Sequence, residues 1–193
     1  MARKQHARSW MRATRHAQTQ KLVVIAAVLA ATVGAGTDVM VASAAGQAAS
    51  VRGAQSATSN TAAAAAASVF AAINHSRAVA HLPAVWLGGR LVNDAHAHNL
   101  AMAAANQLSH QLPGEPSLGA RASRLGVTWS WLGENVGESP SLSSAGALYL
   151  EGMMMNSAGH RANILSTRFS RVGVDVVYDS VHHTLWLTED FAN

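Results

Sequence analysis

Histidine and carboxylate side chains at the ends of expected helices and strands are the residues of this 193-residue chain that could carry chemistry. His110 follows an amphipathic stretch, Glu134 lies between apolar residues in a Gly-Glu-Asn stretch, and His160 follows a turn. Two neutral imidazoles that lie together can hold a divalent cation, with Zn²⁺ the usual candidate, and a nearby carboxylate can position or deprotonate a bound water. The spacing alone does not bring the two histidines together, and Glu134 could equally be a structural carboxylate that accepts hydrogen bonds from loop amides.

Other polar and aromatic side chains have structural interpretations. Glu151 lies on an apolar stripe, with Leu148 and Met155 at i−3 and i+4, rather than on a solvent-facing side of its helix. His98 also lies on an apolar stripe, which favours a core histidine with satisfied hydrogen bonds. The large aromatic side chains are expected in the core or in a cleft wall, since a domain of this size needs bulky apolar residues: Trp86, Trp129, Trp131 and Trp186.

Several kinds of chemistry are excluded by residues or motifs that the sequence lacks. The chain has no cysteine, so it has no disulfide framework, thiol nucleophile or cysteine-ligated zinc site. It also contains no Gly-x-Ser-x-Gly, His-Glu-x-x-His, Walker or Gly-x-Gly-x-x-Gly motif. The histidines and carboxylates are therefore the main candidates.

The elements that must position these side chains are helices first and strands late in the chain. Apolar residues at helical spacing predict helices over 62–81, from 91 onward, over 118–125 and over 142–156, with a further helical start near 160. Alternating apolar residues predict strands over 127–136, 171–178 and 184–191, the last two joined as a hairpin. This order, without regular β-α-β alternation, predicts an α+β fold with a small antiparallel sheet covered by helices.

The N-terminal part of the chain is expected to be a targeting segment followed by a spacer. Residues 1–21 are basic, 22–33 are apolar, and small residues follow, which is typical of a secretory signal peptide. Cleavage is expected after Ala35 or, preferably, after Ala44, so the signal peptide covers 1–44. The alternative is a retained membrane anchor. Residues 45–61 are expected to be a flexible spacer, and 62–193 a folded domain.

The distribution of charge argues against a nucleic-acid partner. The chain has 14 Lys and Arg, 10 Asp and Glu, a net charge of +4 and a pI near 10.3. Six of the basic residues precede position 22, where no acid occurs, and the remainder holds 8 basic and 10 acidic residues, a balance of −2. Cleavage after Ala44 would leave an exported chain with a net charge of −1. The basic pI therefore describes the leader, while arginines of the domain are interspersed with acids: Arg90, Arg121, Arg124, Arg161, Arg168 and Arg171.

Four ordered motifs resemble the CAP superfamily, also called SCP or PR-1-like, in its secreted bacterial form. The motifs are Ile73–Arg77 (Asn-x-x-Arg), Leu91–Met102 with Leu108–His110, Gly133–Val136 (Gly-Glu-Asn-aliphatic) and Met155–Leu165 (His-Arg-x-Asn-Ile-Leu at its end). The resemblance covers about 66–193. It implies a three-layer α-β-α sandwich with a cleft in which His110 and His160 bind a divalent cation, expected to be Zn²⁺, and Glu134, followed by Asn135, is the first acid.

The sequence departs from the family at the second acidic position of that cleft. Ser157 stands where the family has its second Glu, a departure that resembles many bacterial relatives. Glu151 could substitute for that Glu only if the helix brings it back to the cleft. Met154 replaces the family's Trp, and Ala158 replaces its usual Pro. These changes bear on the metal site and on any hydrolytic chemistry, and not on the fold.

Three functions compete. The first is an exported, secreted protein, facing outside if its N-terminal segment is retained as an anchor, whose cleft binds a cation and an extracellular ligand such as cell-wall glycan or peptide, or a lipid. The second is a cell-wall (peptidoglycan) hydrolase in which Glu134, with a pKa raised by desolvation, is general acid or base beside the His110/His160 site. The shortage of a second carboxylate counts against it. The third is a non-catalytic extracellular interaction module in which the polar residues form a core network.

Overall fold

The structure is a computed structural model, and it describes residue 50 and residues 61–193. The expected signal peptide, over 1–44, lies outside the described residues, and so does the expected spacer apart from residues 50 and 61. Within the described part of the chain, no helix is both long enough and apolar enough to cross a membrane.

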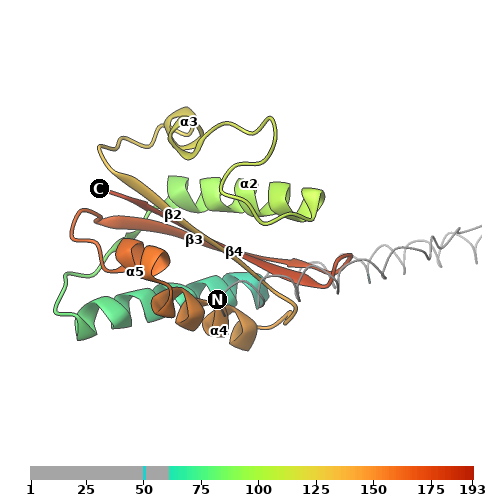
Figure 1. Ribbon diagram of the computed structural model, residues 1–193, viewed down its shortest axis with the longest axis horizontal. Helices are drawn as coiled ribbons and strands as arrows, with labels where there is room; N and C mark the ends of the chain where they lie inside the picture. Colours follow the sequence, from blue (N-terminus) through green and yellow to red (C-terminus); the bar gives the residue numbers. More distant parts are fainter. Residues whose placement is uncertain (1–49, 51–60) are drawn as a thin grey trace, which may run out of the picture. The chain divides into compact units, whose positions relative to one another are not determined.

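A four-stranded sheet forms the middle of the domain (Figure 1). Its strands are β1 (Trp86–Leu87), β2 (Leu132–Ser139), β3 (Arg171–Asp179) and β4 (Thr184–Ala192), in the order β1-β3-β4-β2. The hairpin of β3 and β4 is antiparallel, β2 is antiparallel to β4, and the short β1 is parallel to β3. The expected hairpin is therefore confirmed, and β1 makes the sheet mixed rather than wholly antiparallel.

Helices cover both faces of this sheet, which makes three layers (Figure 1). On one face lie α2 (Gly89–Ala105) and α3 (Leu118–Arg124). On the other lie a helix over 61–79, α4 (Ser144–Asn156) and α5 (Ala158–Ile164). The α-β-α sandwich that the resemblance implied is confirmed.

The larger part of the core lies between the sheet and the helices of the second face. Val69 and Ile73 of the helix over 61–79 pack in one apolar cluster with Leu150 of α4 and Val172 of β3. Val172, Val174 and Val176 are all buried, because alternate residues of a strand share one face. The opposite face of β3 carries Gly173, where a Cβ atom would lie 2.1 Å from the backbone of Leu91 in α2. Glycine is required there because α2 lies directly on the strand.

Several helix and strand boundaries differ from those expected from the sequence. The strand expected over 127–136 begins at Leu132 and continues to Ser139, because residues 127–131 form a loop. The fourth helix begins at Ser144, where the Ser143 side chain accepts a hydrogen bond from the Gly146 amide. Extended backbone at Ser157, with φ −92° and ψ 124°, separates α4 from α5. Strand β1, of two residues, carried too short a pattern to be predicted.

The expectation for the tryptophans is wrong for three of the four. Trp186 of β4 is fully buried, as expected. Trp86, Trp129 and Trp131 are instead 73%, 42% and 49% exposed, and none of them lines the pocket beside His160 described below. Their segments, β1 and the loop before β2, lie at the edge and end of the sheet, outside its apolar core clusters.

Candidate functional site

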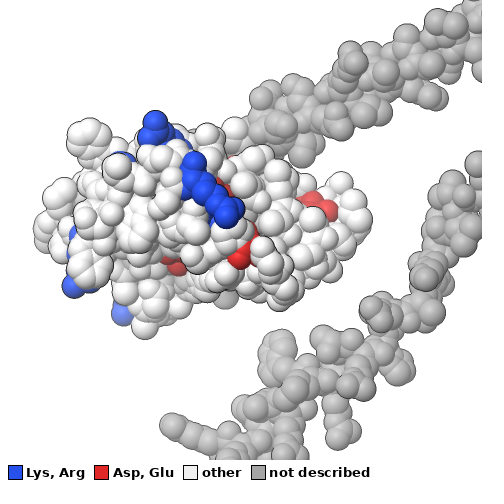
Figure 2. Space-filling view, turned by 90° about the horizontal axis from the view of Figure 1, so that it is seen from above, with Lys and Arg blue, Asp and Glu red and all other residues white. Residues whose placement is uncertain are grey.

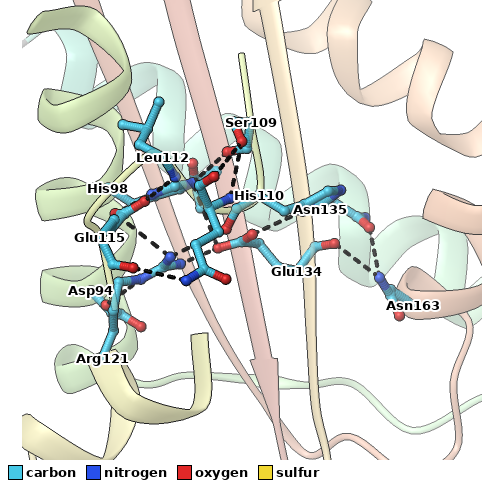
Figure 3. A network of polar contacts seen from close by, with 12 residues as sticks. Asp94, His98, Ser109, His110, Leu112, Glu115, Arg121, Glu134, Asn135 and Asn163 are labelled. Carbon is cyan, nitrogen blue, oxygen red and sulfur yellow. Dashed lines mark hydrogen bonds and ion pairs between the residues drawn. The ribbon is translucent and has the colours of Figure 1, made fainter. Parts of the chain in front are cut away.

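Glu134 is held at both of its carboxylate oxygens. It lies near the start of β2, opposite Asp190 of β4, and its side chain is 3% exposed. Nδ1 of His110 lies 2.9 Å from Oε1, and the Arg121 guanidinium donates to Oε2 (Figure 3). Burial alone would raise the pKa of Glu134, but the hydrogen bond from His110 and the charge of Arg121 lower it below its ordinary value. The expected upward shift of the Glu134 pKa is therefore wrong, because sequence reasoning did not include Arg121.

His110 is the exposed partner of this pair. It lies in the loop after α2, and its side chain is 63% exposed. The hydrogen bond to Glu134 raises the pKa of His110, against the opposing effect of partial burial. With Nδ1 donating to a carboxylate, the other ring nitrogen is free to face the solvent or a ligand. His110 and Glu134 are thus brought together, as the resemblance implied.

His98 makes a hydrogen bond to the backbone of the loop that carries His110. It is fully buried on α2, with Nδ1 2.7 Å from Oε1 of Glu115 and Nε2 2.9 Å from the carbonyl oxygen of Ser109 (Figure 3). The prediction of a satisfied core histidine is confirmed. Because Ser109 precedes His110, this contact sets where the His110 ring stands.

Arg121 of α3 is the central cation of a buried acidic cluster that sequence reasoning missed. Its Nε lies 3.2 Å from Oδ1 of Asp94, and it also pairs with Glu134. Asp190 is fully buried beside this group. Burial raises the pKa of Asp94 and, together with the charge of Glu134, raises the pKa of Asp190 well above its ordinary value. The position of Asp94, a charged residue among the apolar positions of α2, could have indicated a buried charge. No feature of the sequence indicated that Arg121 is buried.

His160 of α5 contacts Asn135, the residue that follows Glu134 on β2. The Asn135 amide donates to the His160 carbonyl oxygen at 3.2 Å and to Oε2 of Glu189 at 2.9 Å. Burial lowers the pKa of His160, and the charge of His110 lowers it further, so the two imidazoles influence each other. Nδ1 of His160 is buried without a hydrogen-bond partner among the described residues. His160 is therefore a neutral imidazole at pH 7 with unused hydrogen-bonding capacity.

Two of the sequence motifs are joined directly by side-chain contacts. Nδ2 of Asn163 donates to Oδ1 of Asn135 at 2.9 Å and to the carbonyl oxygen of Glu134 at 3.2 Å (Figure 3). A Cβ atom at Gly133 would lie 2.7 Å from Oδ1 of Asn163, so only glycine leaves room for this amide. The Gly-Glu-Asn strand and the His-Arg-x-Asn helix are thus spaced to lock β2 against α5.

Glu151 and Ser157, the alternatives for the second acidic position, have different surroundings. Glu151 is buried on α4, where burial and the charge of Glu189 raise its pKa to about 9. It is protonated at neutral pH and belongs to a buried pair with Glu189, whose own pKa burial raises to about 7. Ser157 instead lines a pocket together with His160. Glu151 is not among the residues that line this pocket.

The pocket beside His160, called the α4 pocket below, has a volume of about 230 Å³ and mostly apolar walls. Its walls come from α4, from β2 and from the loop that carries His110. Its lining residues are Leu108, Val136, Gly137, Glu138, Leu150, Met153, Met154, Ser157 and His160. Met154, which stands where the family has a tryptophan, is one of these lining residues.

The histidine pair offers only part of a zinc site. Metal-bound histidines usually donate their second ring N–H to a carboxylate or carbonyl, as His110 does to Glu134, whereas Nδ1 of His160 has no such partner. Both oxygens of Glu134 are already engaged. In residues 61–193 no group of three or more histidine, cysteine or acidic side chains is placed to hold a metal ion. Such a cation would thus have two protein ligands at most, and zinc binding stays a prediction.

Solved structures with the same fold come from extracellular or surface proteins of bacteria. An extracellular SCP-domain protein from Bacillus anthracis is 27% identical with a TM-score of 0.60, covering 68% of this chain and 41% of that one. A cysteine-rich secretory protein from Staphylococcus aureus is 20% identical with a TM-score of 0.52, covering 68% and 39%. An outer surface protein from Borrelia burgdorferi is 14% identical with a TM-score of 0.57, covering 64% and 88%. The last two show the fold alone.

The chain thus spans about two fifths of the length of the Bacillus anthracis protein. No curated protein matches it. The model of one family, described as the cysteine-rich secretory protein family, matches residues 70–191, which include His110, Glu134 and His160. This chain belongs to the CAP family.

Proposed function

We propose that this protein is an exported CAP-domain protein whose α4 pocket binds an extracellular ligand with an apolar body and a polar end, such as a fatty acid. The observation that carries the proposal is the lining of the pocket. Leu108, Val136, Leu150, Met153 and Met154 form its walls. Apolar walls with a few polar groups are typical of sites for lipid-like molecules, whereas a glycan would need many hydrogen-bonding side chains.

His160 and Ser157 supply the neutral polar groups of the α4 pocket, and the exposed Glu138 also lines it. Because burial keeps His160 neutral, it offers one donor and one acceptor rather than a charge. A hydroxyl or carboxylic acid group can pair with such an imidazole without leaving a buried charge. With about 230 Å³, the pocket holds part of a chain rather than a whole lipid, so the rest of the ligand would lie along the surface.

Export is supported by two independent observations. The structural neighbours are described as extracellular or surface proteins. The basic and then apolar residues over 1–33 are typical of an export signal. Contact with a membrane would then run only through an uncleaved N-terminal segment.

A divalent cation is a subsidiary part of the proposal. His110 and His160 would hold it, with water or ligand oxygens completing its coordination, and it would polarise a bound oxygen atom. With two protein ligands its affinity would be well below that of a structural zinc site.

Hydrolysis has less support from the geometry. A general acid needs a proton near neutral pH, but the pKa of Glu134 is lowered and both of its oxygens are paired. The carboxyls whose pKa is raised are buried, and none of them lines the α4 pocket: Asp94, Glu151, Glu189 and Asp190. Glu134 thus holds Arg121 and His110 in place rather than facing a substrate.

The experiment is an equilibrium titration of the full chain with a fluorescent fatty acid. Met153 lines the pocket and is 52% exposed, so Met153→Glu places a charge in the wall without burying it fully. We expect at least about tenfold weaker binding. Leu148→Glu is the matched control, because Leu148 is 43% exposed on the same helix and does not line the pocket. Equal binding by both variants would overturn the proposal, as would binding of neutral oligosaccharides in place of the fatty acid.

A further inference from the structure

Exposed tryptophans and arginines gather at one end of the sheet, away from the α4 pocket. The tryptophans are Trp86 of β1 and Trp129 and Trp131 of the loop before β2. The arginines are Arg90, Arg168 and Arg171. We call this set the Trp-Arg end. We infer that the Trp-Arg end binds an anionic saccharide, meaning a sugar chain that carries carboxylate or phosphate groups.

Backbone and side-chain contacts bring these residues together although they are distant in the sequence. Arg171 begins β3, pairs with Trp86 across the β1–β3 register and donates to the Thr128 carbonyl oxygen at 2.7 Å. The amide of Trp131 donates to the Asn193 side chain, and Arg171 also donates to the Asn193 backbone oxygen. The loop before β2, the start of β3 and the edge strand β1 therefore meet at one place.

Two of the indole rings are held in fixed positions. The Arg168 guanidinium lies 3.9 Å from the centre of the Trp131 ring. Trp129 donates from Nε1 to Oγ of Ser123 at 3.2 Å, and its ring packs so closely on Gly119 that a Cβ atom there would lie 3.0 Å from it. Rings that are already ordered lose little conformational entropy when a ligand stacks on them. The flat apolar face of a sugar ring is a suitable partner for such an indole.

A pocket of about 300 Å³ opens at the same end. Arg90 and Arg171 line it, together with the backbone of Gly88, Gly89 and Gly126. Guanidinium groups recognise carboxylates and phosphates through paired hydrogen bonds, and glycine backbone lets a ligand approach closely.

The charge at this end lacks acidic side-chain partners. Among the described residues, no carboxylate side chain lies within ion-pair distance of Arg90, Arg168 or Arg171; the arginine that forms ion pairs is the buried Arg121. The acids of β3 lie at its middle, Asp175, and at its opposite end, Asp179. On the face shown in Figure 2, acidic atoms and no Lys or Arg lie over the right-hand tip of the domain, where the β3–β4 hairpin is. An anionic ligand fits this arrangement.

A saccharide fits the Trp-Arg end better than a membrane surface does. Side chains that enter a bilayer protrude freely, whereas Trp129 and Trp131 are about half buried and fixed against neighbouring groups. Arg90 and Arg171 line a pocket, which a discrete charged group can enter and a flat surface cannot.

The test is calorimetric titration of the full chain with four probes: a short oligogalacturonate, a phosphorylated oligosaccharide, a neutral cello-oligosaccharide of the same length and vesicles of anionic phospholipid. We expect saturable binding of at least one anionic saccharide, at least about tenfold weaker binding of the neutral one, and weakening by added salt. Binding of the vesicles alone, equal binding of neutral and anionic sugars, or no binding of either anionic saccharide overturns the inference.

Single substitutions test whether the binding depends on the residues of the Trp-Arg end. Trp131→Ala and Arg90→Gln should each weaken it about tenfold, whereas Trp131→Phe, which keeps an aromatic ring, should retain most of it. Tyr149→Ala is the control, because Tyr149 is 67% exposed on α4, outside the Trp-Arg end. All three positions are exposed, so circular dichroism should show native folding of the four variants. Unchanged binding in both Trp131→Ala and Arg90→Gln contradicts the assignment even if the chain binds anionic sugars.

Discussion

Nδ1 of His110 lies 2.9 Å from Oε1 of Glu134, although 24 positions separate the two residues in the chain. The contact joins an exposed imidazole to a buried carboxylate, and Arg121 holds the other oxygen of that carboxylate. Glu134 is thus an ionised anchor between a core arginine and a surface histidine. Its position explains why the pKa of His110 rises while that of Glu134 falls.

Removing the charge of Glu134 should destabilise the domain strongly. In Glu134→Gln the buried Arg121 loses its closest carboxylate, and breaking a buried ion pair costs about 3 kcal/mol or more. The free energy of unfolding in urea measures this effect. Glu138→Gln, at an exposed position on the same strand, is the control and should change stability by less than about 0.5 kcal/mol. Equal stability of the two variants would show that Glu134 is not an anchor.

The buried carboxyl pair of Glu151 and Glu189 should make the domain less stable as the pH rises. A carboxyl whose folded pKa is raised binds its proton more tightly when folded, so its contribution is complete below the unfolded value of 4.5 and is lost through the folded pKa. These folded values are about 7 for Glu189 and about 9 for Glu151. Urea midpoints should therefore fall from mildly acidic to alkaline pH.

Glu151→Gln tests the assignment of that pH dependence. The amide keeps the size of the side chain and cannot ionise, so the decline toward pH 9 should become shallower. Glu134 acts in the opposite sense, since its lowered pKa gives stability that is lost when the pH falls through the folded value. If the parent and Glu151→Gln have parallel pH profiles, Glu151 does not titrate as described.

Zinc should bind weakly, with one ion per chain, through His110 and His160. Calorimetry of the parent and of the two single alanine variants measures this, and each substitution should abolish binding because residues 61–193 place no third protein ligand there. His183→Ala, on the exposed β3–β4 turn, is the control and should bind as the parent does. Absence of zinc binding in the parent would remove the cation from the proposed function.

Gly173→Ala should disrupt the packing of α2 on the sheet. The added Cβ would lie 2.1 Å from the backbone of Leu91, so the helix must move, at a cost of about 3 kcal/mol or more. Gly152→Ala is a matched control, because nothing lies within 4 Å of a Cβ there and alanine favours the helix by up to about 1 kcal/mol. A thermal melt of the two variants should show shifts of opposite sign.

Residue spacing predicted most of the helices and strands, whereas the resemblance to the family, and not the spacing, placed His110 near Glu134. The amphipathic stripe of α2 and the alternating valines of β3 depend on residue spacing, which the chain itself displays. The family motifs added the layer order and placed two histidines near one acid. The short strand β1 and the late start of β2 at Leu132 were missed because neither has a local pattern.

Only the tertiary structure decided what each polar and aromatic side chain faces. Arg121 became a core cation, Glu151 turned to Glu189 rather than to His160, and Trp131 remained at the surface. Burial and charge pairing depend on which distant segments pack together, and one residue type suits opposite environments. Periodicity therefore determined the secondary structure of this protein, whereas the contacts among α2, α3, α5 and the sheet determined the chemistry of its side chains.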